Sequence, residues 1–262
     1  AFDGAGKANG NMGVEFADLD GDSLLDFITT TYQEEMPVYY QAIDPGFYVD
    51  STNLARIDRS LTAHVNWGVG AVDFDNDGDR DLYLSCGHFL DNIRFIDDRT
   101  DVRVADYLLA NDGQGKFSRV AAAGHSFLQV VESGRAAGFD DLDNDGDVAI
   151  VVLNFNAPPS LGRTRVTAAH QHLALRLIGT RSNRDGLGCW IEVVDSRGRR
   201  QRQATFSGRG YESYYGRRSY FGLGDAQATE VRVRWPSGLS ESYAIKNPTM
   251  TLIEGHGRSL KR

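Results

Sequence analysis

The sequence contains few of the residues that form covalent or metal–thiolate centres. Its 262 residues include two cysteines, Cys86 and Cys189, which lie far apart in the chain. No C-x-x-C or C-x-x-C-H pattern occurs, which argues against a zinc ribbon, a thioredoxin-type site and covalently attached haem. The two thiols could form one disulfide or stay free in the core, and the sequence leaves both alternatives open.

Long apolar runs and prolines are also scarce. The longest apolar run, Val148–Leu153, has the length of a strand and is far too short to span a membrane. Six prolines stand against 29 glycines, which indicates tight turns rather than disorder, and the 41% hydrophobic content is enough to bury a core. We expect a soluble protein. The chain starts at Ala1 without a methionine or an apolar leader, so any signal peptide is expected to have been removed.

Common catalytic motifs are missing as well. There is no G-x-S-x-G, H-E-x-x-H, Walker A or dinucleotide-binding pattern. Paired carboxylates for glycoside hydrolysis remain an alternative because acidic residues are abundant, but their spacing fits metal loops better. We therefore expect a protein that is not an enzyme.

Charge divides the chain into two halves. Residues 1–159 hold 10 Lys and Arg against 28 Asp and Glu, whereas residues 160–262 hold 18 against 8. The first half is thus strongly acidic and the second basic, and residues 154–162 between them are rich in turn-forming residues. This pattern predicts two domains, 1–159 and 160–262.

The acidic half contains an internal repeat. Residues 13–28, 68–83 and 136–151 align without gaps, each as an apolar stretch, an acidic loop and a second apolar stretch. The loops begin at Asp18, Asp73 and Asp141, so they are 55 and 68 residues apart. A strand–loop–strand unit at such intervals is typical of propeller blades. We predict three blades.

The composition of the loops indicates calcium. Carboxylates at loop positions 1, 3 and 5 face one point, and a backbone carbonyl at position 7 with a carboxylate at position 9 can complete a shell of hard oxygen ligands. The predicted ligands are Asp73, Asp75, Asp77, the carbonyl of Asp79 and Asp81 in the second loop, Asp18, Asp20, Asp22, the carbonyl of Leu24 and Asp26 in the first, and Asp141, Asp143, Asp145 and the carbonyl of Asp147 in the third.

The three copies differ at two positions. Ser23 replaces the glycine found at position 6 of the other loops, and Ala149 replaces the aspartate at position 9 of the third loop. We expect the third site to be the weakest. A single acidic loop would be read equally well as a solvated turn, but three aligned copies favour metal binding because so many close carboxylates repel one another without a cation.

The basic half reads as a second all-β unit. Short runs with frequent alternation, separated by Gly, Asn or Ser, predict seven strands and a small β-sandwich or barrel-like domain. The runs are Leu173–Ile178, Trp190–Asp195, Arg202–Phe206, Tyr214–Phe221, Glu230–Trp235, Glu241–Ile245 and Thr249–Ile253.

Arginines in this half suggest a second type of site. A dense group, interleaved with tyrosines further along, could bind an anionic polymer such as an acidic glycan. The alternative is a solvated hairpin or a surface that docks on the acidic repeats, and we expect the first arginines to face solvent at a hairpin containing Gly198. The candidate residues are Arg197, Arg199, Arg200, Arg202, Arg217 and Arg218.

The motifs together resemble two known families. The loops resemble FG-GAP/VCBS repeats, the blades of integrin α-chain propellers and of many bacterial extracellular proteins. Residues 173–179, 182–188, 208–213, 221–224 and 235–238 resemble the ASPIC/UnbV domain of cartilage acidic protein and its bacterial relatives. One departure is Cys189-Trp190, where the family has small residues.

This resemblance implies calcium as the cofactor and a secreted, extracellular, periplasmic or cell-surface location. It implies a non-catalytic recognition or scaffold protein with protein or glycan partners; the alternatives are a structural subunit of a larger surface assembly and an anionic-polymer binder, with nucleic acid the least expected ligand. Three blades cannot close a propeller. We therefore expect either further blades upstream or a partner on the open edges, since an open edge is prone to aggregation.

Overall fold

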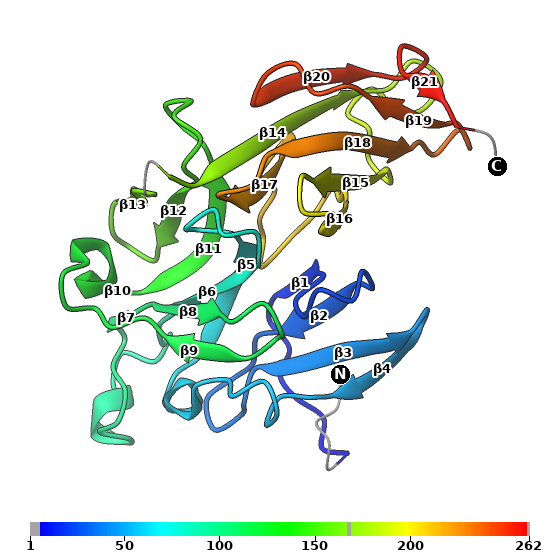
Figure 1. Cartoon of the computed structure of the whole chain (residues 1–262). Helices are drawn as coiled ribbons and strands as arrows, with labels where there is room; N and C mark the ends of the chain where they lie inside the picture. Colours follow the sequence, from blue (N-terminus) through cyan, green and yellow to red (C-terminus); the bar gives the residue numbers. More distant parts are fainter. Residues whose placement is uncertain (1–5, 167–168, 261–262) are drawn as a thin grey trace.

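The computed structural model of the chain describes residues 6–166 and 169–260 and is built of β-sheets (Figure 1). Within these residues the helical segments are three short 3₁₀ turns, η1 (Arg59–Ala63), η2 (Ile93–Phe95) and η3 (Ser126–Gln129). None of these described helices is long or apolar enough to cross a membrane. The all-β prediction is confirmed.

Each predicted repeat forms one antiparallel sheet. The first sheet contains β1 (Val14–Ala17), β2 (Asp26–Thr29), β3 (Val38–Asp44) and β4 (Phe47–Asp50) in that order. The second contains β5 (Asn66–Val72), β6 (Asp81–Cys86), β8 (Tyr107–Asn111) and β9 (Phe117–Arg119), and the third β11 (Gly134–Asp140), β12 (Ala149–Asn154) and β13 (Ser160–Gly162). Two short strands, β7 (Val104–Ala105) and β10 (Val131–Glu132), pair separately.

The second half forms two further sheets. One has the order β17-β14-β20, with β14 (Gln171–Ile178), β17 (Arg218–Gly224) and β20 (Thr249–Ile253). The other has the order β16-β15-β18-β19-β21, with β15 (Trp190–Asp195), β16 (Arg200–Ala204), β18 (Ala228–Arg234), β19 (Ser240–Tyr243) and β21 (Arg258–Ser259). Two of the predicted strands, 190–195 and 249–253, coincide with β15 and β20.

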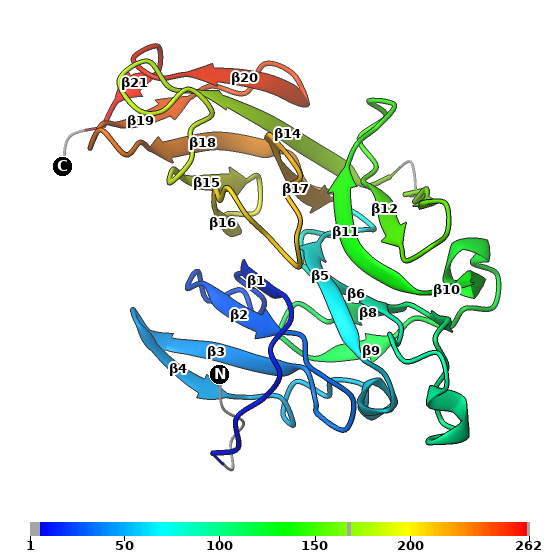
Figure 2. The same cartoon turned by 180° about the vertical axis from the view of Figure 1, so that it is seen from behind.

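Hydrophobic cores lie between successive sheets. The first core joins residues of the first and second sheets, such as Ile28 and Leu84, and leaves both strands β5 and β6 buried on both faces. A second core joins the second and third sheets to Ala174 and Tyr220 of the β17-β14-β20 sheet. A third, around Trp235, joins the two C-terminal sheets. The sheets therefore follow one another as blades do in a propeller (Figures 1 and 2).

The number of blades differs from the prediction of three blades and a separate sandwich. Five sheets take part in the propeller-like arrangement, because the β17-β14-β20 sheet shares a core with the third repeat and extends the series. The charge difference between the halves suggested separate domains, whereas the apolar residues pack across the boundary. Strand β13 pairs with β12, so the third sheet also extends past residue 159.

The connection from β16 to β17 crosses to the first sheet (Figure 2). Gly210 exchanges two backbone hydrogen bonds with Val14 of β1, at 2.8 and 3.1 Å. It has φ of +64°, and an added Cβ would lie 2.6 Å from the carbonyl oxygen of Val69, so glycine is required there. This bridge ties the connection between β16 and β17 to the edge of β1 at Val14.

A buried charge cluster holds this connection in place. The Arg209 guanidinium donates to the Glu15 carboxylate at 2.9 Å, and the Tyr215 hydroxyl donates to the same carboxylate. Glu15 is 1% exposed, so the pair is well shielded from water. Tyr215 therefore points into the core instead of joining a strand, and β17 begins at Arg218 rather than at the predicted Tyr214.

Candidate metal centre in the aspartate loops

The three loops have the same backbone structure. Positions 4 and 6 of each loop have positive φ, at Gly21 and Ser23, Asn76 and Gly78, and Asn144 and Gly146. In every loop the position-6 amide donates to the position-1 carboxylate, at 3.0, 2.9 and 3.1 Å. Ser23 adopts this left-handed conformation at φ of +72° although it carries a Cβ, which is unfavourable for a residue other than glycine. The three sequence repeats therefore share the same loop conformation and the same hydrogen bond.

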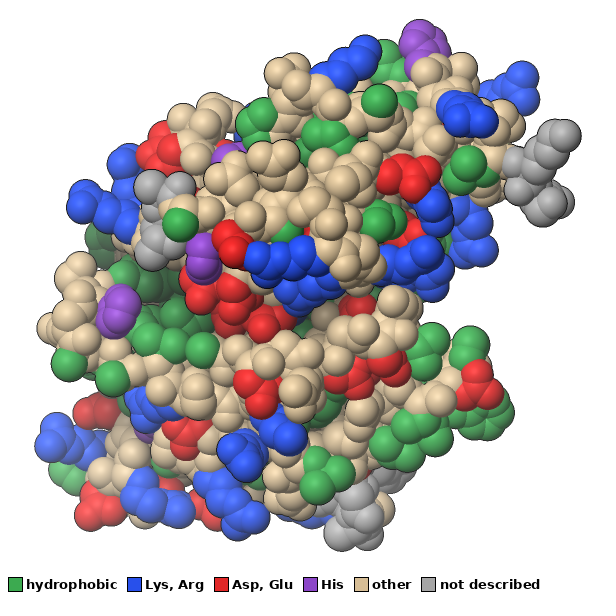
Figure 3. Space-filling model, in the orientation of Figure 1, with side chains coloured by type: hydrophobic (Ala, Val, Ile, Leu, Met, Phe, Trp, Pro, Cys, Tyr) green, Lys and Arg blue, Asp and Glu red, His purple; other side chains and the backbone are tan. Residues whose placement is uncertain are grey.

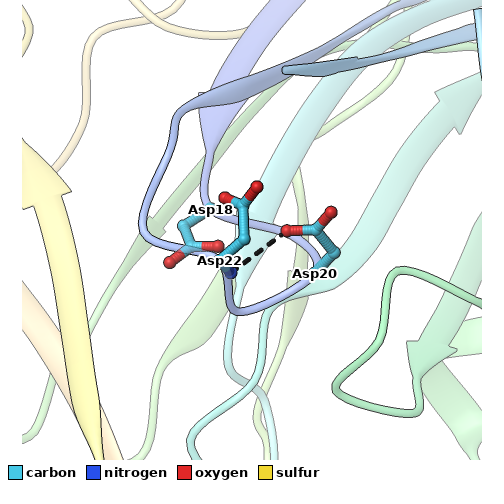
Figure 4. Close-up of side chains that lie close together, drawn as sticks. All are labelled: Asp18, Asp20 and Asp22. Atoms are coloured by element: carbon cyan, nitrogen blue, oxygen red, sulfur yellow. Dashed lines mark hydrogen bonds between the residues drawn. The ribbon is translucent and has the colours of Figure 1, made fainter. Parts of the chain in front are cut away.

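Each loop gathers the three carboxylates at positions 1, 3 and 5. One carboxylate oxygen from each member lies within 4.8 Å of the others in all three groups. Figure 4 shows the first group, in which Asp18, Asp20 and Asp22 project from one tight turn between β1 and β2. The amide of Asp22 donates to Asp20 at 3.2 Å. The other groups are Asp73, Asp75 and Asp77, and Asp141, Asp143 and Asp145.

The position-9 aspartates stand outside these groups among the described residues. Asp81 accepts hydrogen bonds from the amides of Phe74 and Asn111, at 3.2 and 2.9 Å. Asp26 accepts from the amides of Leu19 and Ala42, at 2.9 and 2.8 Å. These carboxylates fasten each loop to the neighbouring strand, a role that the sequence analysis did not foresee.

The position-7 residues of the three loops are held through their backbone amides. Their amides donate to the position-5 carboxylates, so Leu24, Asp79 and Asp147 bind Asp22, Asp77 and Asp145 at 2.7, 3.0 and 2.9 Å. This hydrogen bond also recurs in all three loops. It fixes the turn at position 7, the residue whose carbonyl is the predicted calcium ligand.

Burial disfavours the ionised form of several loop carboxyls. It raises the pKa of Asp18 to about 6 and that of Asp73 to about 7. It also raises the pKa of Asp26 and Asp81 to about 7, and that of Asp79 to about 8, where the hydrogen bond and charge of Asp77 add to the effect. A cation bound at these loops would favour the ionised carboxylates and lower their pKa values.

The donor set of the loops fits calcium. All gathered ligand atoms are carboxylate oxygens, which suit a hard cation of high coordination number. In the third loop, Asp141 Oδ1 is buried and accepts no hydrogen bond from the described residues. A buried carboxylate oxygen without a partner is costly, and a cation would satisfy it.

The C-terminal half packs directly on the second loop. The Arg199 guanidinium donates to the carbonyls of Asp77 and Gly78, at 2.9 and 2.7 Å. A Cβ added at Gly222 would lie 2.0 Å from Asp73 Oδ2, so β17 lies against the loop itself. At the edge of the same loop, His170 Nδ1 lies 2.6 Å from the carbonyl oxygen of Asp75.

The predicted arginine group is divided in the structure. Arg199 is exposed, as expected for the first members of the group, but its guanidinium also hydrogen-bonds the second loop. Arg197 pairs with Asp225, and Arg217 lies 3.9 Å from Asp185, both on the surface. Arg218 donates to Asn144 of the third loop. The remaining two, Arg200 and Arg202, bind Glu192 at 3.3 and 2.9 Å.

Sequence reasoning missed three residues beside Arg200 and Arg202. Strands β15 and β18 bring Trp190, Arg232 and Arg234 to the same face of their sheet. The signal in the sequence that could have shown this is the alternation of residues within the runs 190–195 and 230–235, which places these side chains on one face. Cys86 and Cys189, whose pairing the sequence left open, are both buried and free.

Comparison with known proteins supports part of the family resemblance. The family model described as "ASPIC and UnbV" matches residues 179–255, which includes β15 to β20. No curated protein matches the chain.

Proposed function

We propose that this chain is a non-catalytic extracellular calcium-binding module that serves recognition or acts as a scaffold. The ASPIC/UnbV match and the propeller-like fold fit such a role. The main observation behind this proposal is that the same loop structure occurs three times, each time with three carboxylates close together. Calcium would rigidify the loops that connect the first two strands of each of the three repeats.

The type of site supports an extracellular location in this proposal. Three carboxylates in an open loop, without a bidentate glutamate, suit the weak calcium sites of extracellular modules, with a Kd of about 10⁻⁴ to 10⁻³ M. The millimolar calcium outside cells would fill such sites. Two buried free thiols are compatible with this location because neither reaches solvent.

Calorimetric titration of the purified chain with calcium and with magnesium tests the proposal. We expect calcium binding at up to three sites, weaker binding of magnesium, and a melting temperature that falls when a chelator is added. An unchanged melting temperature with and without chelator, together with no calorimetric signal for calcium, would refute the calcium part of the proposal.

A further inference from the structure

A large cleft opens between the first and the last sheet, where the series of five would close into a ring. It has a volume of about 760 Å³, and its walls are residues 23–25 before β2 and the β3–β4 hairpin of the first sheet, and the outer face of the β16-β15-β18-β19-β21 sheet. Figure 3 shows it as a hollow whose upper wall carries Lys and Arg side chains and whose lower wall ends in hydrophobic ones. Ligand sites typically have this size and shape.

The upper wall carries more guanidinium groups than carboxylates. Arg200, Arg202, Arg232 and Arg234 line the cleft, and Arg200, Arg202 and Arg232 all bind the single buried carboxylate of Glu192. Arg232 also binds Glu230 at 2.7 Å. Arg200 and Arg202 share Glu192, which cannot satisfy all their donors, and their side chains remain 55% and 45% exposed. The wall therefore offers unused N–H donors in a forked geometry that suits carboxylate or sulfate groups.

Arg234 adds a second feature to this wall. Its guanidinium lies over the indole of Trp190, 5.8 Å from the ring centroid, and forms no ion pair with a described carboxylate. Apart from Glu192, the cleft is lined by one carboxylate, Asp44 on the opposite wall. Four arginines against two acidic residues give the cleft a local positive charge in a chain whose net charge is −8.

The lower wall presents one aromatic side chain, Tyr48, which lines the cleft and is 40% exposed. Its ring packs edge-on against Phe27 at 4.8 Å, and Phe27 in turn stacks on Tyr40 at 4.5 Å. These contacts hold the Tyr48 ring in place from behind, so that a rigid apolar surface faces a cleft which also contains Trp190. Rigid aromatic rings bind the apolar face of a flat ligand at little entropic cost.

We infer that this cleft binds an acidic oligosaccharide, with a sugar ring packed on Tyr48 and Trp190 and its carboxylate or sulfate groups held by Arg200, Arg202 and Arg234. The inference names the ligand class of the recognition role proposed above and rests on it. Sugars combine apolar ring faces with polar edges, which matches one aromatic ring on each wall beside a group of arginines. A nucleic acid would offer different groups, backbone phosphates and flat bases instead of carboxylates or sulfates on a sugar ring, and tripolyphosphate in the titration below tests for phosphate binding.

Calorimetric titration of the full chain in saturating calcium tests this inference. The probes are a galacturonic acid tetramer (carboxylate only), a heparin-derived tetrasaccharide (carboxylate and sulfate), neutral cellotetraose and tripolyphosphate. We expect at least one acidic tetrasaccharide to bind about tenfold or more tightly than cellotetraose and tripolyphosphate. The tetrasaccharide that binds more tightly tells whether the arginines select carboxylate or sulfate.

Three variants separate the contributions of the two walls. Arg200→Gln with Arg234→Gln should weaken acidic tetrasaccharide binding about a hundredfold, and Tyr48→Ala about fivefold to tenfold, whereas Tyr48→Phe should retain binding. Arg197→Gln with Arg217→Gln is the matched control, because it removes the same charge from exposed residues outside the cleft. Each variant's melting temperature checks that it is folded.

Several outcomes would overturn the inference. These are no binding of either acidic tetrasaccharide at millimolar concentration, equal loss in the control pair, or tripolyphosphate binding as tightly with no effect of Tyr48→Ala. If calcium still raises the melting temperature in those cases, the calcium module stands and the cleft assignment alone fails. Release of new reducing ends from the bound sugar would instead refute only the non-catalytic role.

Discussion

The first and the second aspartate loops share one sequence pattern but lie in different surroundings. In the first loop, Asp18 and Asp20 line an open cavity, and Asp20 accepts from the Gln41 side chain of its own sheet at 2.6 Å. In the second, Asp73 is 3% exposed beneath strand β17 and Arg199. The same motif is a surface loop in one sheet and part of the contact between the two halves in another.

This difference shows that a metal loop can have two roles at once. The second loop sits between halves of opposite charge, and the structure places an arginine and a glycine of the basic half against it. A change in this loop should therefore affect both cation binding and the attachment of the C-terminal sheets, whereas a change in the first loop should leave that attachment unchanged.

The largest effect is expected for Gly222→Val, which removes the close contact of β17 with the second loop. The new side chain would clash with Asp73 Oδ2 and with the backbone of Asn76, so the free energy of unfolding should fall by at least about 3 kcal/mol. Gly138→Ala is the control, because its Cβ would meet nothing nearer than Tyr215 at 3.7 Å. Denaturant unfolding of both variants measures the difference, and equal stabilities would show that the contact is not tight.

Removing matched carboxylates from the two loops tests their different roles. Asp77→Ala with Asp81→Ala should abolish calcium stabilisation at the second loop, worth about 2.7 kcal/mol at a hundred times the Kd, and should also loosen the C-terminal half. Asp22→Ala with Asp26→Ala, at the same loop positions, should remove the calcium stabilisation of the first site and the hydrogen bonds of Asp26 to its own sheet, but should leave the contact between the halves intact. Melting temperatures with calcium and with chelator check this. A larger loss in the first-loop variant would contradict the comparison.

Arg199→Gln should weaken the contact between the halves without removing a loop carboxylate. Loss of the two hydrogen bonds to the carbonyls of Asp77 and Gly78 should lower the free energy of unfolding by about 1–2 kcal/mol. Arg197→Gln should be nearly neutral, since Arg197 and its partner Asp225 are 64% and 67% exposed. If thermal unfolding ranks the two variants equally, the contact of Arg199 contributes nothing beyond surface charge.

The smallest effect concerns the third loop, which lacks the position-9 carboxylate. In Ala149→Asp the new carboxylate should accept from the amide of Leu142, as Asp26 and Asp81 do from Leu19 and Phe74. A better fixed loop should bind calcium roughly tenfold more tightly, a gain of about 1.4 kcal/mol. Ala149→Asn keeps an acceptor without the charge and should gain less. A calcium affinity unchanged in calorimetry would count against this role of position 9.

Local sequence was enough to predict the loops and most of the strands. Alternating apolar residues and glycines predicted β15 and β20 to the residue, and the spacing of aspartates placed three carboxylates of each loop together. Local sequence did not predict the conformation of Tyr214 and Tyr215, which the alternating pattern had assigned to a strand. Their conformation depends on Glu15, about 200 residues away in the chain, which binds Arg209 and Tyr215 in the core.

By itself the sequence determined the all-β class, the three repeats and the convergence of Asp73, Asp75 and Asp77, because each follows from the period of a strand or from a turn of a few residues. Only the tertiary structure decided that five sheets form one series, that Arg199 docks while Arg200 and Arg202 face a cleft, and that Tyr48 lies across from them. The reason is physical: local geometry depends on neighbouring residues, whereas the packing of sheets depends on cores shared by segments far apart in the chain.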